Sequence, residues 1–289
     1  MNSITYSFFR LLPKNAVSRA FGEFSRAKIP FLSKLAARWF VGRYKIDLEE
    51  SVVPAKGFAN IHEVFTRKLK DGVRDIEDKA EVVSPVDGVL TAFGNLTGAN
   101  LELMQVKGKY YSLESLLRDA ELARKFSGGV WATIYLSPHN YHRIHSPASG
   151  NVKAAYYCPG TLYPVNAGSV ERIEGLFAIN ERLITQIETY DGGEILLVKV
   201  GATNVGRIAV EYKKDLITNT MPPFADRNSL FTRWEAEQDY PFTKGQEIAR
   251  FEMGSTIILV CNSVVAKRTE HKFAELEGHE VKVGKELMK

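Results

Sequence analysis

Apolar residues along the chain follow two different periods, which divide it near residue 46. The apolar positions of the segment 32–40 are Leu32, Leu35, Ala36, Trp39 and Phe40. Their i, i+3, i+4, i+7, i+8 spacing predicts an amphipathic helix. A shorter stripe of the same kind precedes it at Val17, Phe21 and Phe24. The first part of the chain is therefore expected to be a set of short amphipathic helices.

After residue 46, short β-like runs alternate with Gly, Pro and Asn, which is typical of a β-rich domain. These runs are 81–93, 129–136, 150–157, 183–190, 194–201, 206–213 and 255–266. Helices are expected at 60–70 and at 112–126, with Ser112 as the N-cap of the second. Weak periodicity over 214–240 predicts a long loop. We therefore predict an α+β fold, with a mostly antiparallel β catalytic domain, peripheral helices and an N-terminal amphipathic helical segment.

One short pattern occurs twice in this β-rich part. S-P-V-D-G-V-L at 84–90 and S-P-A-S-G-N-V at 146–152 share S-P-x-x-G followed by an apolar position. A Pro-containing turn closed by Gly reverses the chain at the end of a strand. Two copies 62 residues apart favour a duplicated β unit. Chance similarity between two turn sequences is the alternative.

Charge separates the same two parts of the chain. Residues 1–45 hold nine Lys or Arg and one acidic residue, Glu23, whereas the whole chain has a net charge of only +4. Basic helices with Phe, Trp and Leu on the opposite face suit an anionic membrane surface, at about 1 kcal/mol per basic residue. Alternatively, these helices pack on the domain and their basic side chains are solvated. Nucleic acid is not expected as a partner, because residues 46–289 carry no net positive charge.

Composition sets the remaining limits. The chain has 289 residues, 45% hydrophobic and 25% charged, which is enough for a sizeable core. Two cysteines, Cys158 and Cys261, give no disulfide framework and favour a reducing compartment. No run reaches the roughly 18 to 20 apolar residues that span a bilayer, and no signal peptide is recognisable.

The most specific candidate chemistry lies in F-E-M-G-S-T-I-I-L-V at 251–260. The hydroxyl of Ser255 adjoins the carbonyl of Gly254, which it can attack if a base takes its proton. His145 in P-H-N-Y-H-R-I-H-S-P is the candidate base, and Asp87 in S-P-V-D-G is the candidate orienting carboxylate. Together the three segments indicate a protein that cuts itself.

Seven fragments in order resemble the phosphatidylserine decarboxylases of the bacterial membrane-associated type, which are pyruvoyl-dependent and self-processing. The fragments are S-P-V-D-G, Q-V-K-G-K-Y-Y-S-L-E-S-L-L, Y-L-S-P-H-N-Y-H-R-I-H-S-P, P-G-T-L-Y-P-V-N, L-F-A-I-N-E-R, V-G-A-T-N-V-G and G-S-T. The one departure is Met253, where the family usually has Leu, and these side chains are similar in volume and polarity.

The resemblance implies that the chain cleaves itself. His145 would act as the general base on Ser255, with Asp87 holding the imidazole in the useful tautomer. The Ser255 oxygen would convert the amide of Gly254 into an ester, and elimination would release the fragment 1–254. Hydrolysis of the resulting dehydroalanine would release ammonia and leave a pyruvoyl group at position 255. The mature enzyme would be a β chain of 1–254 and an α chain of 255–289.

The resemblance also implies decarboxylation of phosphatidylserine to phosphatidylethanolamine through a Schiff base with the pyruvoyl group. His142 is the candidate proton donor, and Tyr135 is expected to help shape the pocket. Neither a metal ion nor pyridoxal phosphate is expected. The expected assembly is a homodimer of α/β protomers, bound peripherally to the cytoplasmic face of the inner membrane.

Other interpretations of these residues stay open. Asp87 is also a common type of turn residue, and His139, His142 and His145 have a spacing that metal sites use. A stable Ser-His-Asp hydrolase would keep Ser255 as a free hydroxyl. A β-rich phosphocarrier would bear phosphate on a histidine and would not cleave. An unprocessed, inactive relative is disfavoured because the candidate residues are intact.

Overall fold

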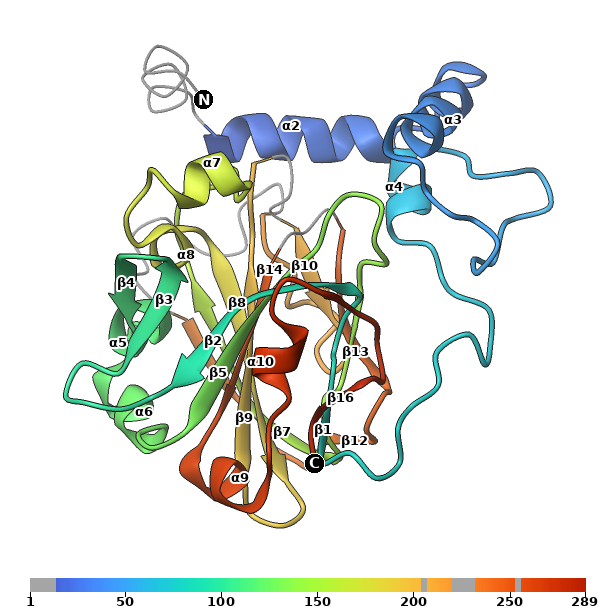
Figure 1. Ribbon diagram of the computed structural model, residues 1–289. Coiled ribbons are helices and arrows are strands. Elements are labelled where there is room, and N and C mark those ends of the chain that lie inside the picture. The colour runs from blue at the N-terminus through green and yellow to red at the C-terminus, as the bar shows by residue number, and fades with distance from the viewer. Residues whose placement is uncertain (1–13, 204–206, 220–231, 253–255) are drawn as a thin grey trace.

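The computed structural model of the protein describes residues 14–203, 207–219, 232–252 and 256–289 (Figure 1). The helices are α2 Lys14–Arg26, α3 Leu32–Tyr44, α4 Ile61–Phe65, α5 Leu113–Leu117, α6 Ala120–Lys125, α7 Ala167–Val170, α8 Leu176–Ile179, α9 Ser263–Arg268 and α10 Phe273–Leu276. The first strands are β1 Val82–Val83, β2 Gly88–Asn95, β3 Glu102–Val106, β4 Lys109–Ser112, β5 Val130–Tyr135, β6 Arg143–His145, β7 Gly150–Cys158 and β8 Arg182–Thr189. The remaining strands are β9 Glu194–Val200, β10 Ile208–Val210, β11 Thr232–Glu235, β12 Pro241–Phe242, β13 Glu247–Phe251, β14 Thr256–Cys261, β15 Glu280–Val281 and β16 Glu286–Met288.

One large sheet organises the described part of the chain. Its strands run in the order β11-β7-β8-β9-β14-β5-β2-β15, and β12 pairs with β7 at one edge. A second, smaller sheet consists of β10, β13 and β6. All the ladders that join these named strands are antiparallel. The predicted α+β class, with mostly antiparallel strands and few helices, is confirmed.

The large sheet is buried on both faces, which explains why its strands are almost continuously apolar. One face packs against the small sheet, α3 and α4, and includes Ile257 and Leu259 of β14. The other face packs against the β3–β4 hairpin and α5, α6 and α8, and includes Ile258 and Val260. Side chains alternate between these two cores along the strand because successive residues of a strand point to opposite faces.

Strand β14 lies at the centre of this arrangement. All six of its residues are buried, and all six pair with β9 on one side and β5 on the other. Its first residue, Thr256, lies between Val200 and Tyr135. The residue directly after Ser255 is therefore paired with a neighbouring strand on each side.

The repeated S-P-x-x-G segments adopt the same local structure. The hydroxyl of Ser84 donates to the carbonyl of Val86, and that of Ser146 donates to the carbonyl of Ala148, each at 2.7 Å. The two segments also bind each other reciprocally. Val83 N donates to Pro147 O at 2.9 Å, and His145 N donates to Pro85 O at 2.8 Å. This two-fold pattern supports the duplicated β unit and brings His145 beside the Asp87 turn.

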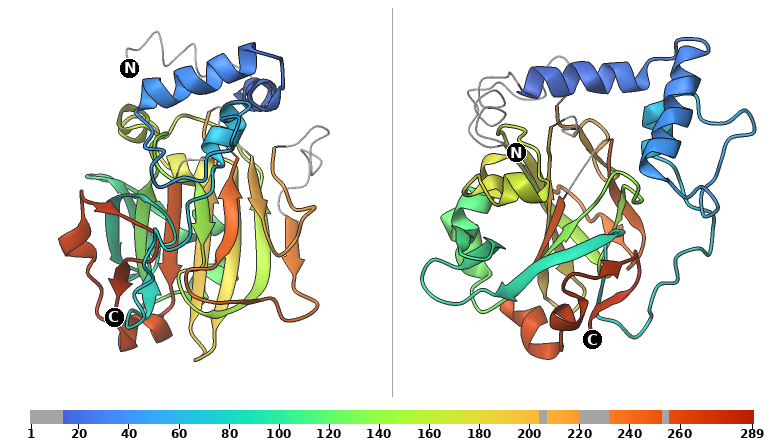
Figure 2. Two further views of the ribbon diagram at one scale, coloured as in Figure 1. Left: turned by 90° about the vertical axis from the view of Figure 1, so that its right-hand side faces the viewer. Right: turned by 45° about the horizontal axis from the view of Figure 1, so that its top comes forward.

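The N-terminal helices are apolar toward the outside. They lie together at one end of the β domain (Figures 1 and 2). In α3, Leu35 and Trp39 are 52% and 61% exposed, whereas Ser33 and Ala37 face the protein. Phe24 of α2 is also exposed, while Ser18 and Ser25 are buried. The helical spacing was predicted correctly. Most of the apolar stripe on α3 is exposed and does not belong to the hydrophobic core. Among the described helices, none is long and apolar enough to cross a bilayer.

Several predicted boundaries were wrong. The expected helix 60–70 ends at Phe65, and 112–126 is two helices separated at Arg118, which has a φ of 55°. The expected strand 255–266 ends at Cys261, because Asn262 caps α9 by accepting from Val265 N. Part of the expected loop, 232–235, pairs as β11 with β7. Ser112 is the predicted N-cap, but of the shorter helix α5.

The glycine of the second S-P-x-x-G segment gives a test of the packing at that turn. A Cβ on Gly150 would lie 2.2 Å from the carbonyl oxygen of Glu188, so Gly150→Ala should destabilise the full chain by about 1–3 kcal/mol. Gly42→Ala is the matched control, because Gly42 lies in α3 with no atom within 4 Å of the new methyl group. The control should be neutral or stabilising by up to about 1 kcal/mol. Urea denaturation measures both, and equal stability of the two variants would contradict this packing.

Candidate functional site

The predicted cleavage bond, Gly254–Ser255, lies outside the described residues. On one side of it Thr256 begins β14, and on the other Glu252 follows β13. Glu252 is buried and forms ion pairs with Arg207 at 2.5 Å and Arg250 at 3.1 Å. Both flanks of the predicted bond are thus anchored, one by a central strand and the other by buried charge pairs. The Glu252 cluster was not predicted, because Arg207 is distant from Glu252 in the chain.

His142 lies against the end of β13. Its carbonyl oxygen accepts from Phe251 N at 3.0 Å, which places it beside the strand that leads to the predicted bond. Its side chain is buried, and its ring centroid lies 3.8 Å from that of Phe65. Its Nδ1 is 2.8 Å from the carbonyl oxygen of Asn140. A carbonyl oxygen only accepts, so Nδ1 carries the proton and the lone pair of the neutral ring lies on Nε2.

His145 lies farther along the same ladder, opposite Glu247. Its Nδ1 donates to the carbonyl oxygen of Gly245 at 2.6 Å, and its Nε2 accepts from the hydroxyl of Tyr141 at 3.0 Å. Burial lowers the pKa of His145, although the Gly245 bond, Glu247 and Asp87 act in the opposite direction. The imidazole is therefore neutral near pH 7, with its basic nitrogen on the Tyr141 side.

The predicted hydrogen bond between Asp87 and His145 is not formed. The carboxylate of Asp87 binds the guanidinium of Arg74 through two bonds of 3.1 and 2.5 Å, and it also accepts from Val283 N at 2.9 Å. The carbonyl of Gly245 occupies the histidine nitrogen that we assigned to Asp87. A cation and a main-chain N–H outcompete a neutral imidazole for the carboxylate. Asp87 acts on His145 only through its charge, which raises the pKa of the imidazole.

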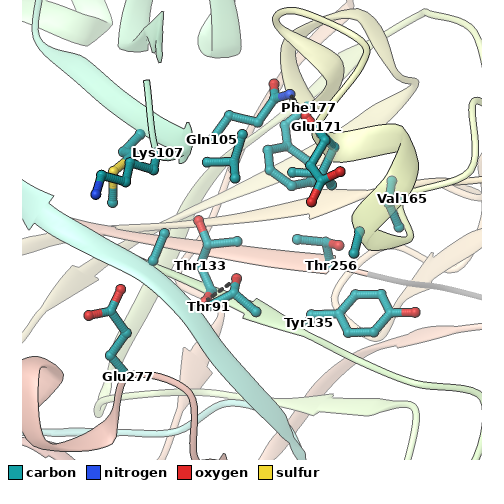
Figure 3. Close-up of a pocket in the computed structure, with 15 residues that line it drawn as sticks. Thr91, Gln105, Lys107, Thr133, Tyr135, Val165, Glu171, Phe177, Thr256 and Glu277 are labelled. Carbon is teal, nitrogen blue, oxygen red and sulfur yellow. Dashed lines mark hydrogen bonds between the residues drawn. The ribbon is translucent and has the colours of Figure 1, made fainter. Parts of the chain in front are cut away.

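Tyr135 lines a cavity of about 510 Å³ on the other face of the large sheet (Figure 3). Thr256, Thr133 and Phe177 share its wall, and Lys107, Glu171 and Glu277 are its charged lining residues. We expected Tyr135 to shape one pocket with the histidines, but neither His142 nor His145 lines this cavity. Tyr135 is joined to the site through its pairing with Thr256 instead.

The alternative of a metal site finds no support in the part of the chain that is described. There, no group of three or more His, Cys, Asp or Glu side chains is placed to hold a metal ion. The two cysteines are free and buried, in agreement with the absence of a disulfide framework.

The fold and these side chains define a β-rich domain that carries a histidine pair beside β13 and a buried, paired carboxylate just before β2. A family model described as Phosphatidylserine decarboxylase matches residues 61–289, and one described as PSD matches residues 8–45. The chain is 44% identical over 256 residues to the phosphatidylserine decarboxylase proenzyme of Anaeromyxobacter sp. (strain K), which covers 88% of both chains. It is 39% identical over 263 residues to the proenzyme of that name from Myxococcus xanthus (strain DK1622), covering 90% of both. The chain therefore belongs to the phosphatidylserine decarboxylase family, as the seven fragments predicted.

Loss of the Asp87–Arg74 ion pair should lower the stability of the fold, independently of any effect on catalysis. The side chains of Asp87 and Arg74 are only 8% and 10% exposed, so Asp87→Asn should lower the unfolding free energy by about 1.5–3 kcal/mol. The measurement uses urea denaturation in the Ser255→Ala background, so that chain cleavage does not contribute. Asp191→Asn, which breaks an exposed pair with Arg268, is the matched control and should cost at most about 1 kcal/mol. An Asp87→Asn cost as small as the control would contradict the buried pair.

Proposed function

We propose that this chain converts phosphatidylserine to phosphatidylethanolamine and carbon dioxide, after cleaving itself between Gly254 and Ser255. The observation that carries the proposal is the family membership, which covers residues 61–289 and includes relatives named as proenzymes. The central position of β14 supports it, because a cut before Thr256 would leave every pairing of that strand in place. Neither the hydrolase nor the phosphocarrier alternative accounts for this membership.

Self-cleavage is assigned to Ser255 and His145. In this proposal Nε2 of His145 exchanges its hydrogen bond from Tyr141 for one from the Ser255 hydroxyl and takes the proton of that hydroxyl, and the freed oxygen attacks the carbonyl carbon of Gly254. The Gly245 carbonyl supports this role by holding the other ring proton on Nδ1. Asp87 contributes through its negative charge, which stabilises the imidazolium. Elimination then releases 1–254 with a terminal carboxylate, and water releases ammonia from residue 255.

Decarboxylation is assigned to the new N-terminus and His142. The pyruvoyl group would supply an electrophilic carbonyl and an electron sink for the bond that breaks. The attachment of Thr256 to β5 and β9 supports a fixed position for such a group at residue 255. His142, which holds one proton on Nδ1, would take up a second proton on Nε2 from the ammonium group of the substrate and deliver it to the carbon that loses carbon dioxide. Tyr135 would contribute indirectly, because its strand β5 pairs with Thr256 of β14.

The membrane contact is assigned to α2 and α3. Exposed apolar side chains gather there at Val17, Phe24, Ile29, Phe31, Leu32, Leu35 and Trp39. Exposed basic side chains accompany them, including Lys34, Arg38 and Arg43. Such a surface inserts its apolar side chains into the interface while its cations bind anionic headgroups. The proposed location is peripheral, at the cytoplasmic face of the inner membrane, with a homodimer of α/β protomers.

The activity test uses vesicles that contain phosphatidylserine. The wild type should release carbon dioxide and form phosphatidylethanolamine, and Ser255→Ala should do neither and stay uncleaved. His145→Ala should also stay uncleaved, whereas His142→Ala should cleave and then decarboxylate at least about 10²-fold more slowly. Product analysis and gel electrophoresis separate the two steps. Normal cleavage in both histidine variants would show that the assigned roles are wrong.

The membrane test uses flotation with anionic vesicles. Replacing Leu35 and Trp39 by Ser removes two exposed apolar side chains and should lower the bound fraction severalfold. Tyr190→Ser is the control, because Tyr190 is 66% exposed but belongs to the turn between β8 and β9. Equal flotation of the double variant and the wild type would show that α3 does not contribute to membrane binding.

A further inference from the structure

Three consecutive residues at the C-terminal end of α4, Phe65, Thr66 and Arg67, enclose the segment that carries His142. The ring of Phe65 packs on the imidazole, with centroids 3.8 Å apart. The carbonyl of Thr66 accepts two bonds from Arg143, of 3.0 and 2.8 Å. Arg67 donates through Nη2 to the main chain just before the histidine. Contacts therefore reach His142 from its ring, from the residue after it and from the turn before it.

The Arg67 contacts bear directly on the histidine tautomer. Its Nη2 donates to His139 O at 2.8 Å and to Asn140 O at 3.2 Å. The second of these oxygens is the one that accepts from Nδ1 of His142 at 2.8 Å. A carbonyl has two lone pairs, so one oxygen can serve both donors. The guanidinium thus fixes the acceptor that determines which ring nitrogen of His142 carries the proton.

The turn that presents this carbonyl is closed by its own side chain. Asn140 Oδ1 accepts from Ser137 N at 2.7 Å, and Asn140 N donates to Ser137 O at 2.9 Å. These bonds hold the turn, but neither sets the direction in which the Asn140 carbonyl points toward the ring. Arg67 supplies that restraint from just beyond α4, and its Nη1 lies 3.3 Å from the carbonyl oxygen of Val64 within that helix.

Burial of the charged Arg67 side chain is unfavourable unless its guanidinium forms hydrogen bonds that compensate for the lost water. The residue is 6% exposed, and its hydrogen bonds within the described residues all go to main-chain carbonyls. Removing a guanidinium from water costs several kcal/mol, and an apolar side chain of similar length would fill the same space at lower cost. Packing alone therefore does not account for an arginine here.

We infer that Arg67 is a positioning residue for His142, which holds the 139–140 main chain so that the imidazole keeps its proton on Nδ1 and its lone pair on Nε2. Phe65 restricts the ring from its face, and Thr66 anchors the following residue through Arg143. The inference rests on the proposed function only for what His142 then does.

The test reads the ring of His142 directly by nitrogen NMR of the full-length chain, alongside the decarboxylation kinetics. Wild type should show the Nδ1–H tautomer, whereas Arg67→Met should show a mixture of tautomers. In the kinetics, Arg67→Met should lower kcat by up to about 10²-fold with little change in KM, since a misplaced catalytic group slows chemistry more than binding. Arg67→Lys keeps a donor and a charge, so it should restore part of kcat and of the tautomer signal.

Arg182→Met is the matched control. Arg182 is another buried arginine that donates to main-chain carbonyls, including those of Leu116 and Ala178, but it lies beside the other core. The control should lose stability and leave the His142 signal unchanged.

If Arg67→Met does not fold, Phe65→Leu tests the same enclosure and should also mix the tautomers. A single Nδ1–H tautomer and unchanged kcat in the folded Arg67 variant would overturn the inference. Absence of decarboxylation in the wild type would instead count against the proposed function, because the ring signal does not depend on activity.

Discussion

The site depends on one constraint, which is that β14 is hydrogen-bonded on both sides from its first residue. Thr256 pairs with Val200 and Tyr135, and the pairing continues without interruption to Cys261. A central strand of this kind cannot shift without breaking two ladders and opening two cores. Thr256, the second residue of the chain that cleavage would create, is therefore held in place by contacts that exist before cleavage. The segment 255–289 would stay bound to the rest of the chain because its strands pair with β2, β5, β9 and β1.

Around this fixed strand, the histidines are placed by backbone contacts more than by side-chain pairs. His145 is held by Pro85 on its main chain and by Gly245 on its ring, and the first contact belongs to the reciprocal S-P-x-x-G pairing. His142 is held by Asn140 and by Phe65, whose ring also lies 6.4 Å from that of Phe40 in α3. The outward-facing apolar helices and the histidine site thus share one packed segment, α4. Membrane contact and chemistry would meet at that helix.

Much of the fold followed from the sequence because strand patterns and turn residues are local signals. The β-like runs were found, the repeated turns proved to be equivalent, and Ser112 caps a helix as predicted. The break between two helices at Arg118 was not predicted, because the pattern of apolar residues does not show that the Arg118 backbone is in the left-handed region. The hydrogen-bond partners of Asp87 were also missed. Its acceptor capacity is taken by Arg74 and Val283, and no spacing rule relates residues so far apart in the chain. Periodicity identified the stripe on α3 but not the direction it faces, because an amphipathic helix looks the same whether its apolar side meets a core or a lipid.

Self-cleavage of the backbone before β14 can be read from the intact mass of the purified protein under denaturing conditions. We expect two species that divide between Gly254 and Ser255, the smaller one beginning with a pyruvoyl group in place of serine. For Ser255→Ala we expect a single uncleaved species. A wild-type protein that stays at 32.4 kDa with a free Ser255 hydroxyl would show that the chain does not cleave itself.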